Sequence, residues 1–140
     1  MLTEKIKVVL DTNIIISAFI SPFGASAEIF ELFLKRNIVN YTSKEIIEEL
    51  ARVICMPKFI GSIENYDKEF MIDNFRLLSV VIEPALKEKV VKADPEDDKL
   101  INCAQSVGAI LISGDHHLLG LRAYKNVRIL SPREFLERLK

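Results

Sequence analysis

The sequence predicts a single α/β domain with a layered architecture, a parallel β-sheet of about five strands with helices on both faces. Short apolar segments alternate along the chain with segments of helical periodicity, and no two apolar segments look like the arms of a tight hairpin. No internal repeat or low-complexity run divides the 140 residues. Because one domain typically contains 100–200 residues, residues 1–140 are expected to share one core.

The expected strands are short and rich in aliphatic residues. Residues 6–10 form the first, an apolar run of the type found in buried parallel sheets. The other expected strands are residues 38–41, 80–82, 109–112 and 127–130.

The expected helices lie between these strands and are marked by capping residues. They are a short helix after Asp11 that ends near residues 21–24, and then residues 25–36, 44–55, 66–78, 95–107 and a last helix from 132. Ser43 and Asp94 are typical N-caps, Gly108 is a typical C-terminal glycine, and Ser131 with Glu134 forms a capping box.

Composition limits the function. The chain is 49% hydrophobic and 28% charged, as in soluble globular proteins, and its net charge of -1 excludes a global basic field for nucleic acid. Cys55 and Cys103 match no metal or redox spacing, so both are expected to be small buried hydrophobes in a reducing cytosol. No run approaches the ~20 apolar residues of a membrane span, and we expect a cytoplasmic protein.

Two aspartates directly follow expected strands. Asp11 ends VVLDTN and Asp115 ends ILISGD. In open α/β sheets, sites form beyond the carboxyl ends of strands where the strand order reverses. If these two strands are neighbours, the two carboxylates converge.

Two helices can add carboxylates to the same edge. At about 100° per residue, Glu49 lies at the margin of its helix's apolar face, whereas Glu48 points away from the core. On the helix from residue 95, Asp97 is expected to face inward and Asp98 outward. Clustered carboxylates repel one another, and a hard divalent cation such as Mg²⁺ or Mn²⁺ relieves the repulsion.

Each acidic residue also has a structural explanation of its own. Asp97 can serve only as a residue of the first helical turn, Glu49 can be solvated, and Asp115 can be a turn residue after glycine. Asp11 is the hardest to explain structurally because it ends a buried strand.

The motifs together resemble the PIN domain family, in particular VapC-type ribonuclease toxins of toxin–antitoxin systems. The resemblance rests on VVLDTNIIISAF, TSKEIIEELARVICMPKF, DPEDDKLINCAQSVGAILISGD and ILSPREFLERL, in that order and spacing. It implies that the four acidic positions of the family are Asp11, Glu49, Asp97 and Asp115, and that Asn13 and Ser113 are the supporting polar residues.

One position departs from the family pattern. Many relatives have a second aspartate two residues after the fourth acidic position, where this chain has His117. His117 is expected to be a loop residue, with metal ligation as the alternative, and Asp98 is a further possible site residue. Whether the site holds one metal or two stays open.

The resemblance implies a Mg²⁺- or Mn²⁺-dependent endoribonuclease that leaves a 5′-phosphate and a 3′-hydroxyl. Asp11, Asp97 and Asp115 would hold the metal, and Glu49 would complete the shell or orient the attacking water. Candidate RNA-binding cations are Arg52, Lys58, Arg76 and the lysines of residues 87–92. The implied partners are an RNA substrate, a cognate antitoxin and a second copy of the chain.

Other phosphate-handling α/β domains fit less well. A receiver domain needs its key aspartate after the third strand, and a haloacid-type phosphatase needs one at Asn13. No glycine-rich phosphate loop is present. A PIN-like module that binds RNA or protein without cleavage stays open.

Overall fold

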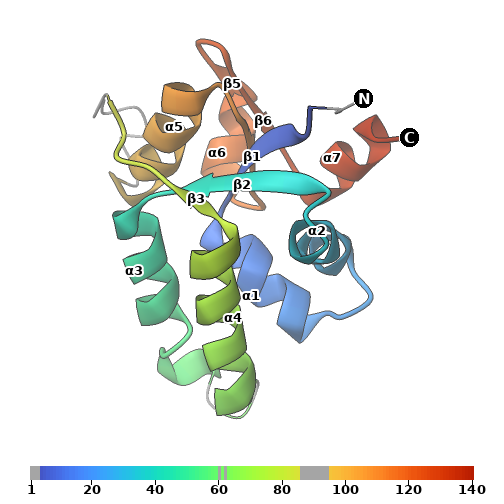
Figure 1. Ribbon diagram of the computed structural model, residues 1–140, viewed down its shortest axis with the longest axis vertical. Helices are drawn as coiled ribbons and strands as arrows, with labels where there is room; N and C mark the ends of the chain where they lie inside the picture. The colour runs from blue at the N-terminus through green and yellow to red at the C-terminus, as the bar shows by residue number, and fades with distance from the viewer. Residues whose placement is uncertain (1–3, 60, 62, 86–94) are drawn as a thin grey trace.

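The fold is a twisted sheet with helices on both sides, and the computed structural model describes residues 4–59, 61, 63–85 and 95–140 (Figure 1). The strands are β1 (Ile6–Leu10), β2 (Ile38–Thr42), β3 (Val80–Val81), β4 (Ile110–Ile112), β5 (Ala123–Tyr124) and β6 (Val127–Leu130). The helices are α1 (Thr12–Ile20), α2 (Ala25–Leu34), α3 (Lys44–Val53), α4 (Asn65–Leu78), α5 (Pro95–Val107), α6 (His116–Leu121) and α7 (Pro132–Arg138), with a 3₁₀ turn at Pro57–Phe59. The expected cap Asp94 and the lysines of residues 87–92 lie outside the described residues.

The strand order is β3-β2-β1-β4-β6-β5, and every pair except β5 with β6 is parallel. The chain moves outward from β1 through β2 to β3 and then returns to the other side of β1 with β4. This reversal places the switch point between β1 and β4, where Leu10 is in register with Ile112. Asp11 and Ser113, the residues that directly follow these two strands, therefore lie side by side.

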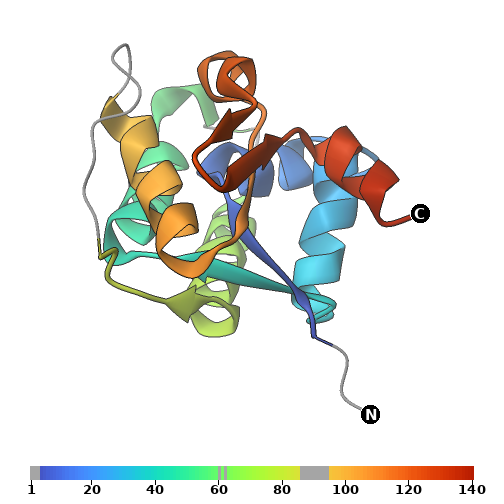
Figure 2. The same cartoon turned by 90° about the horizontal axis from the view of Figure 1, so that it is seen from above.

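Helices cover the sheet from both sides, as predicted. In Figure 1, α1 to α4 lie below β2, whereas α5 and α6 lie above it. The strands separate α5 from α7 in Figure 2. Val8, Val9 and Leu10 of β1 are completely buried, so the first strand runs through the core. Its apolar residues hold Asp11 at a fixed point on the sheet edge.

The last strands differ from the prediction. Five strands were expected without a hairpin, but β5 and β6 form an antiparallel pair in which Tyr124 is in register with Val127. The two-residue turn contains Lys125, whose φ of 54° is in the left-handed region that glycine usually occupies. Since the turn sequence lacks glycine, the usual signal for such a hairpin is missing.

Cys103 is buried and Cys55 is exposed, so the prediction is correct for Cys103 and wrong for Cys55. Burial raises the pKa of the Cys103 thiol to about 12, which keeps it protonated and apolar. Cys55 is exposed because α3 ends at Val53, two residues before the predicted end of the helix.

No single helix in the described part of the chain is long and apolar enough to cross a membrane. The helices α1 and α2 reach that length and composition only as a pair, which is bent by 108°.

Candidate acidic site at the carboxyl end of the sheet

Asp11 is a buried carboxylate at the junction of β1 and α1. Its side chain is the N-cap of α1, and the residue is only 5% exposed. Oδ1 accepts a hydrogen bond from the Asn13 backbone N–H at 3.3 Å, and Oδ2 accepts one from Asn13 Nδ2 at 3.1 Å. Asn13 therefore binds both oxygens of Asp11.

Ser113 connects the ends of β1 and β4. Its fully buried hydroxyl donates to Asp11 Oδ2 at 2.6 Å and accepts from the Asp115 backbone N–H at 3.0 Å. A hydroxyl can donate and accept at once, so one side chain fixes both junctions. Ser113 therefore links the Asp11 carboxylate to the Asp115 backbone, whereas the Asp115 carboxylate accepts hydrogen bonds from α6.

The surroundings raise the pKa of Asp11 above its ordinary value of 3.8. Burial is the largest cause, and the negative charge of Asp115 acts in the same direction. Hydrogen bonds from Ser113, Asn13 and Thr12 oppose the shift and favour the charged form. The carboxylate is thus held in place by donors while its charge lacks full compensation.

Glu49 reaches the same site from α3. Its Oε2 accepts a hydrogen bond from the Thr12 hydroxyl at 3.2 Å, and that hydroxyl also lies 3.5 Å from Asp11 Oδ1. The Glu49 side chain is 12% exposed, whereas that of Glu48 is 64% exposed. The prediction of Glu49 over Glu48 as the inward residue is therefore confirmed.

Lys99 is a positive residue inside this acidic site. Its Nζ lies 3.2 Å from Glu49 Oε1, and its side chain is only 15% exposed. The more exposed Arg52 approaches the same oxygen at 4.0 Å. Neither Lys99 nor Thr12 was among the site residues predicted from the sequence. The signal for Thr12 was its place directly after Asp11, but Lys99 has no local signal, since it depends on the packing of α5 beside α3.

Asp97 and Asp98 lie in the first turn of α5. Asp97 is 6% exposed, so its predicted inward position is confirmed. The prediction that Asp98 faces outward is wrong, because Asp98 is only 9% exposed. The helical projection assumed one covered face, whereas α5 packs against β1 and β2 and also against α3.

His117 was expected in a loop but lies in the first turn of α6. Its side chain is exposed, and its backbone N–H donates to Asp115 Oδ1 at 2.7 Å. Asp115 also accepts from the Leu118 N–H at 3.4 Å, so it is the N-cap of α6. The capping aspartate makes the short helix possible, and the loop assignment was wrong for this reason.

The donors at this edge suit a hard divalent cation in their chemistry. They are carboxylate and hydroxyl oxygens, the ligands that Mg²⁺ and Mn²⁺ prefer. Within the described ranges, no three His, Cys, Asp or Glu side chains come close enough to form a metal site. Thr12 instead lies between the carboxylates of Asp11 and Glu49, and Ser113 links the Asp11 carboxylate to the Asp115 backbone N–H.

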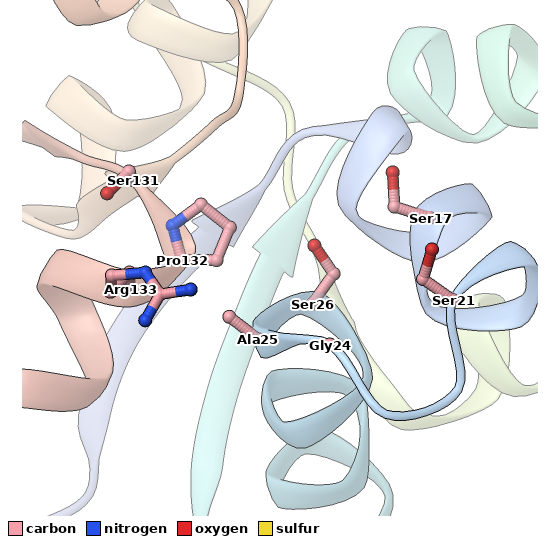
Figure 3. Close-up of a pocket in the computed structure, with 8 residues that line it drawn as sticks. All are labelled: Ser17, Ser21, Gly24, Ala25, Ser26, Ser131, Pro132 and Arg133. Atoms are coloured by element: carbon pink, nitrogen blue, oxygen red, sulfur yellow. The ribbon is translucent and has the colours of Figure 1, made fainter.

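A separate cavity of about 440 Å³ lies between the end of α1, the start of α2 and the start of α7 (Figure 3). Its lining residues are Ser17, Ser21, Gly24, Ala25, Ser26, Ser131, Pro132 and Arg133. None of the acidic residues described above lines this cavity, so it is distinct from the acidic site.

The fold and the site define an α/β domain with a buried carboxylate at the switch point of a mostly parallel sheet. Residues 7–117 match the family described as PIN domain, from β1 to the first turn of α6. The chain therefore belongs to the PIN domain family, whose members are generally nucleases.

The chain is also similar to a curated protein and, in its fold, to solved structures. The chain is 37% identical over 142 residues to the uncharacterized protein MJ1680 of Methanocaldococcus jannaschii, covering 95% of this chain and 91% of that protein. The fold is similar to that of PAE2754 from Pyrobaculum aerophilum, with a TM-score of 0.66, 16% identity, and coverage of 96% of this chain and 89% of that one. It is also similar to a chain of VapBC2 from Rickettsia felis, crystallised with a promoter DNA fragment, with a TM-score of 0.59, 16% identity, and coverage of 90% and 98%.

Proposed function

We propose that this protein is a Mg²⁺- or Mn²⁺-dependent endoribonuclease that hydrolyses RNA phosphodiester bonds. The observation that carries the proposal is the buried carboxylate of Asp11, which Ser113 links to the Asp115 backbone and Thr12 links to Glu49. Burying a charge in this way is costly, and carboxylates perturbed by burial and a neighbouring charge cluster at functional sites. Membership of a family of nucleases supports the same conclusion.

Each polar residue has a proposed role in this site. Asp11, Asp97 and Asp115 would hold the metal, with Glu49 completing its shell. Bound there, the metal would polarise the scissile phosphate and lower the pKa of a water molecule. Ser113 and Asn13 orient the Asp11 carboxylate through the bonds at 2.6 Å and 3.1 Å. Asp98 and His117 are possible additional site residues.

The RNA would be held by local positive charge. Arg52, Lys58 and Arg76 are exposed, and Arg52 lies beside Glu49 at the edge of the site. The net charge of -1 makes the protein as a whole a weak electrostatic ligand for RNA. We therefore expect binding to depend on these few cations rather than on the overall field.

The proposed biological role is that of the toxin in a toxin–antitoxin pair. The similar fold in VapBC2, whose structure was determined with promoter DNA, supports an antitoxin protein as the partner. We propose the cytoplasm as the location, and a second copy of this chain as a further partner.

The test is an RNA cleavage assay with Mn²⁺ or Mg²⁺ that compares the wild type with Asp11→Asn and Asp97→Asn. Structured and unstructured RNAs are both used because the sequence preference is unknown. We expect cleavage by the wild type, none with a chelator, and strongly reduced cleavage by both variants. Cleavage that survives both substitutions, or survives chelation, would contradict the metal-dependent mechanism.

A second candidate is a PIN-like module that binds RNA or protein without cleaving it. The observation that favours it is the ion pair of Glu49 with Lys99, together with the lack of three converging ligands in the described part of the chain. RNA binding in a gel-shift assay with no cleavage under any metal condition would favour this candidate over the nuclease.

A further inference from the structure

Two adjacent glutamates on α3 each form an ion pair with a lysine, in very different surroundings. Lys44 and Glu48 lie 3.9 Å apart, one helical turn from each other, with side chains 88% and 64% exposed. Lys99 and Glu49 lie 3.2 Å apart and connect α5 to α3, with side chains 15% and 12% exposed. The first is an ordinary surface pair, which contributes little to stability. The Lys99–Glu49 pair is largely buried from solvent.

The enclosed pair needs an explanation because desolvating an ammonium group is expensive. The cost is offset only by strong negative charge nearby. Glu49 provides part of that charge, and the Thr12 hydroxyl that binds Glu49 lies 3.5 Å from Asp11. The ammonium of Lys99 therefore belongs to the same electrostatic cluster as Asp11.

The two oxygens of the Glu49 carboxylate contact different groups. Oε1 faces Lys99 and Oε2 faces Thr12. A divalent cation placed among these acids would compete with Lys99 for Glu49, since one carboxylate cannot fully neutralise both cations. It would also be repelled by the ammonium itself.

We propose that Lys99 is the internal counter-cation of the acidic site: it neutralises Glu49 before metal binds, gives up that contact when metal binds, and so sets the metal affinity. This inference rests on the proposed metal-dependent function. Lys99 acts here as a positioning residue, through its contact with Glu49.

The test compares Lys99→Met with the wild type by titration calorimetry with MnCl₂ and by thermal unfolding in a chelator. Removing the ammonium is expected to strengthen Mn²⁺ binding about tenfold, a modest change for a charge at this distance after screening. The same variant should unfold at a lower temperature without metal, since Glu49 loses its counter-charge. Added Mn²⁺ should raise its Tm by more than that of the wild type.

Three further variants make the result specific. Lys99→Arg retains the charge and should keep wild-type Mn²⁺ affinity, and Lys99→Gln removes the charge while keeping a donor for Glu49, in case the methionine variant does not fold. Lys44→Met removes the matched surface lysine and should change neither quantity. In a Glu49→Gln background, Lys99→Met should strengthen Mn²⁺ binding less than it does in the wild type, because only the direct repulsion by the ammonium is then removed.

Unchanged or weaker Mn²⁺ binding by Lys99→Met and Lys99→Gln would overturn the inference, as would a loss of RNA binding with unchanged metal affinity. If one of these results is obtained and the wild type still binds Mn²⁺ and cleaves RNA, the proposed function stands and only the role of Lys99 fails. If neither the wild type nor the variants bind Mn²⁺, the inference and the metal-dependent mechanism fail together.

Discussion

Two junctions at the carboxyl edge of the sheet use the same local device. At the end of β1, Asp11 caps α1 by accepting from the Asn13 N–H at 3.3 Å. After β4, Asp115 caps α6 by accepting from the His117 N–H at 2.7 Å. A side-chain carboxylate at an N-cap satisfies a helix donor that has no partner within the helix. Both aspartates therefore act as helix N-caps.

They differ in burial and in their side-chain partners. Asp11 is 5% exposed and also accepts from the Ser113 hydroxyl, whereas Asp115 is partly exposed and binds backbone donors of its own helix. Capping accounts for the Asp115 contacts. It does not account for a carboxylate enclosed in the core, since a partly exposed residue caps a helix equally well. Asp115 therefore needs no role beyond helix capping to explain its contacts, whereas the burial of Asp11 indicates a second role.

The largest expected effect is the loss of cleavage in Asp11→Asn. Asparagine caps helices about as well as aspartate, so the fold should persist while the charge is removed. We expect cleavage to fall at least about 100-fold, since a metal ligand contributes several kcal/mol to the transition state. Single-turnover cleavage with Mn²⁺ measures the effect, and circular dichroism checks the fold. Asp73→Asn, at an exposed position, is the matched control. Wild-type cleavage by Asp11→Asn would show that cleavage does not need the Asp11 carboxylate.

The second prediction concerns the link between the two junctions. Ser113→Ala removes the 2.6 Å hydrogen bond to Asp11 and leaves the Asp115 N–H without that acceptor. Hydrogen bonds to charged groups contribute more than neutral ones, so the free energy of unfolding should fall by about 2 kcal/mol. Urea unfolding at neutral pH with a chelator measures it. A fall below about 0.5 kcal/mol would mean that Ser113 does not hold the buried carboxylate in solution.

The sequence was informative where local periodicity and burial agree. The apolar run before Asp11 identified a buried strand with a polar residue at its end. The regular apolar face of α3 separated Glu49 from Glu48, because the buried residues of this helix, Ile46, Ile47 and Leu50, follow the helical period.

Prediction from sequence periodicity failed where two packed elements determine the environment of one residue. Asp98 was placed on the outer side of α5, yet it is only 9% exposed, and α5 packs against both the sheet and α3. Lys99 reaches Glu49 across the same contact. No periodicity within α5 contains that information, because it depends on which helix packs beside it.

The third prediction uses pH to sharpen the contrast between the two aspartates. The folded pKa of Asp11 is raised above 3.8, so its charged form is less favourable in the folded state than in the unfolded state. Without metal, Asp11→Asn should therefore be the more stable protein at neutral pH. As the pH falls through the folded pKa of Asp11 toward 3.8, the wild type takes up a proton and the difference should shrink. Chemical unfolding across pH 4–7 in a chelator measures the gap, and a gap that widens as pH falls would contradict the direction of the shift.

The smallest effect is expected at Asp115. Asp115→Ala removes the cap of the six-residue helix α6 and should lower the free energy of unfolding by about 1 kcal/mol, while Asp115→Asn retains the cap and should cost less. If Asp115 also belongs to the site, both variants should lose cleavage equally despite this difference in stability. Parallel urea unfolding and RNA cleavage of the two variants therefore separate its two roles. Normal cleavage by Asp115→Asn would leave Asp115 as a cap alone, and Asp11 as the only one of the two strand-end aspartates that the chemistry needs.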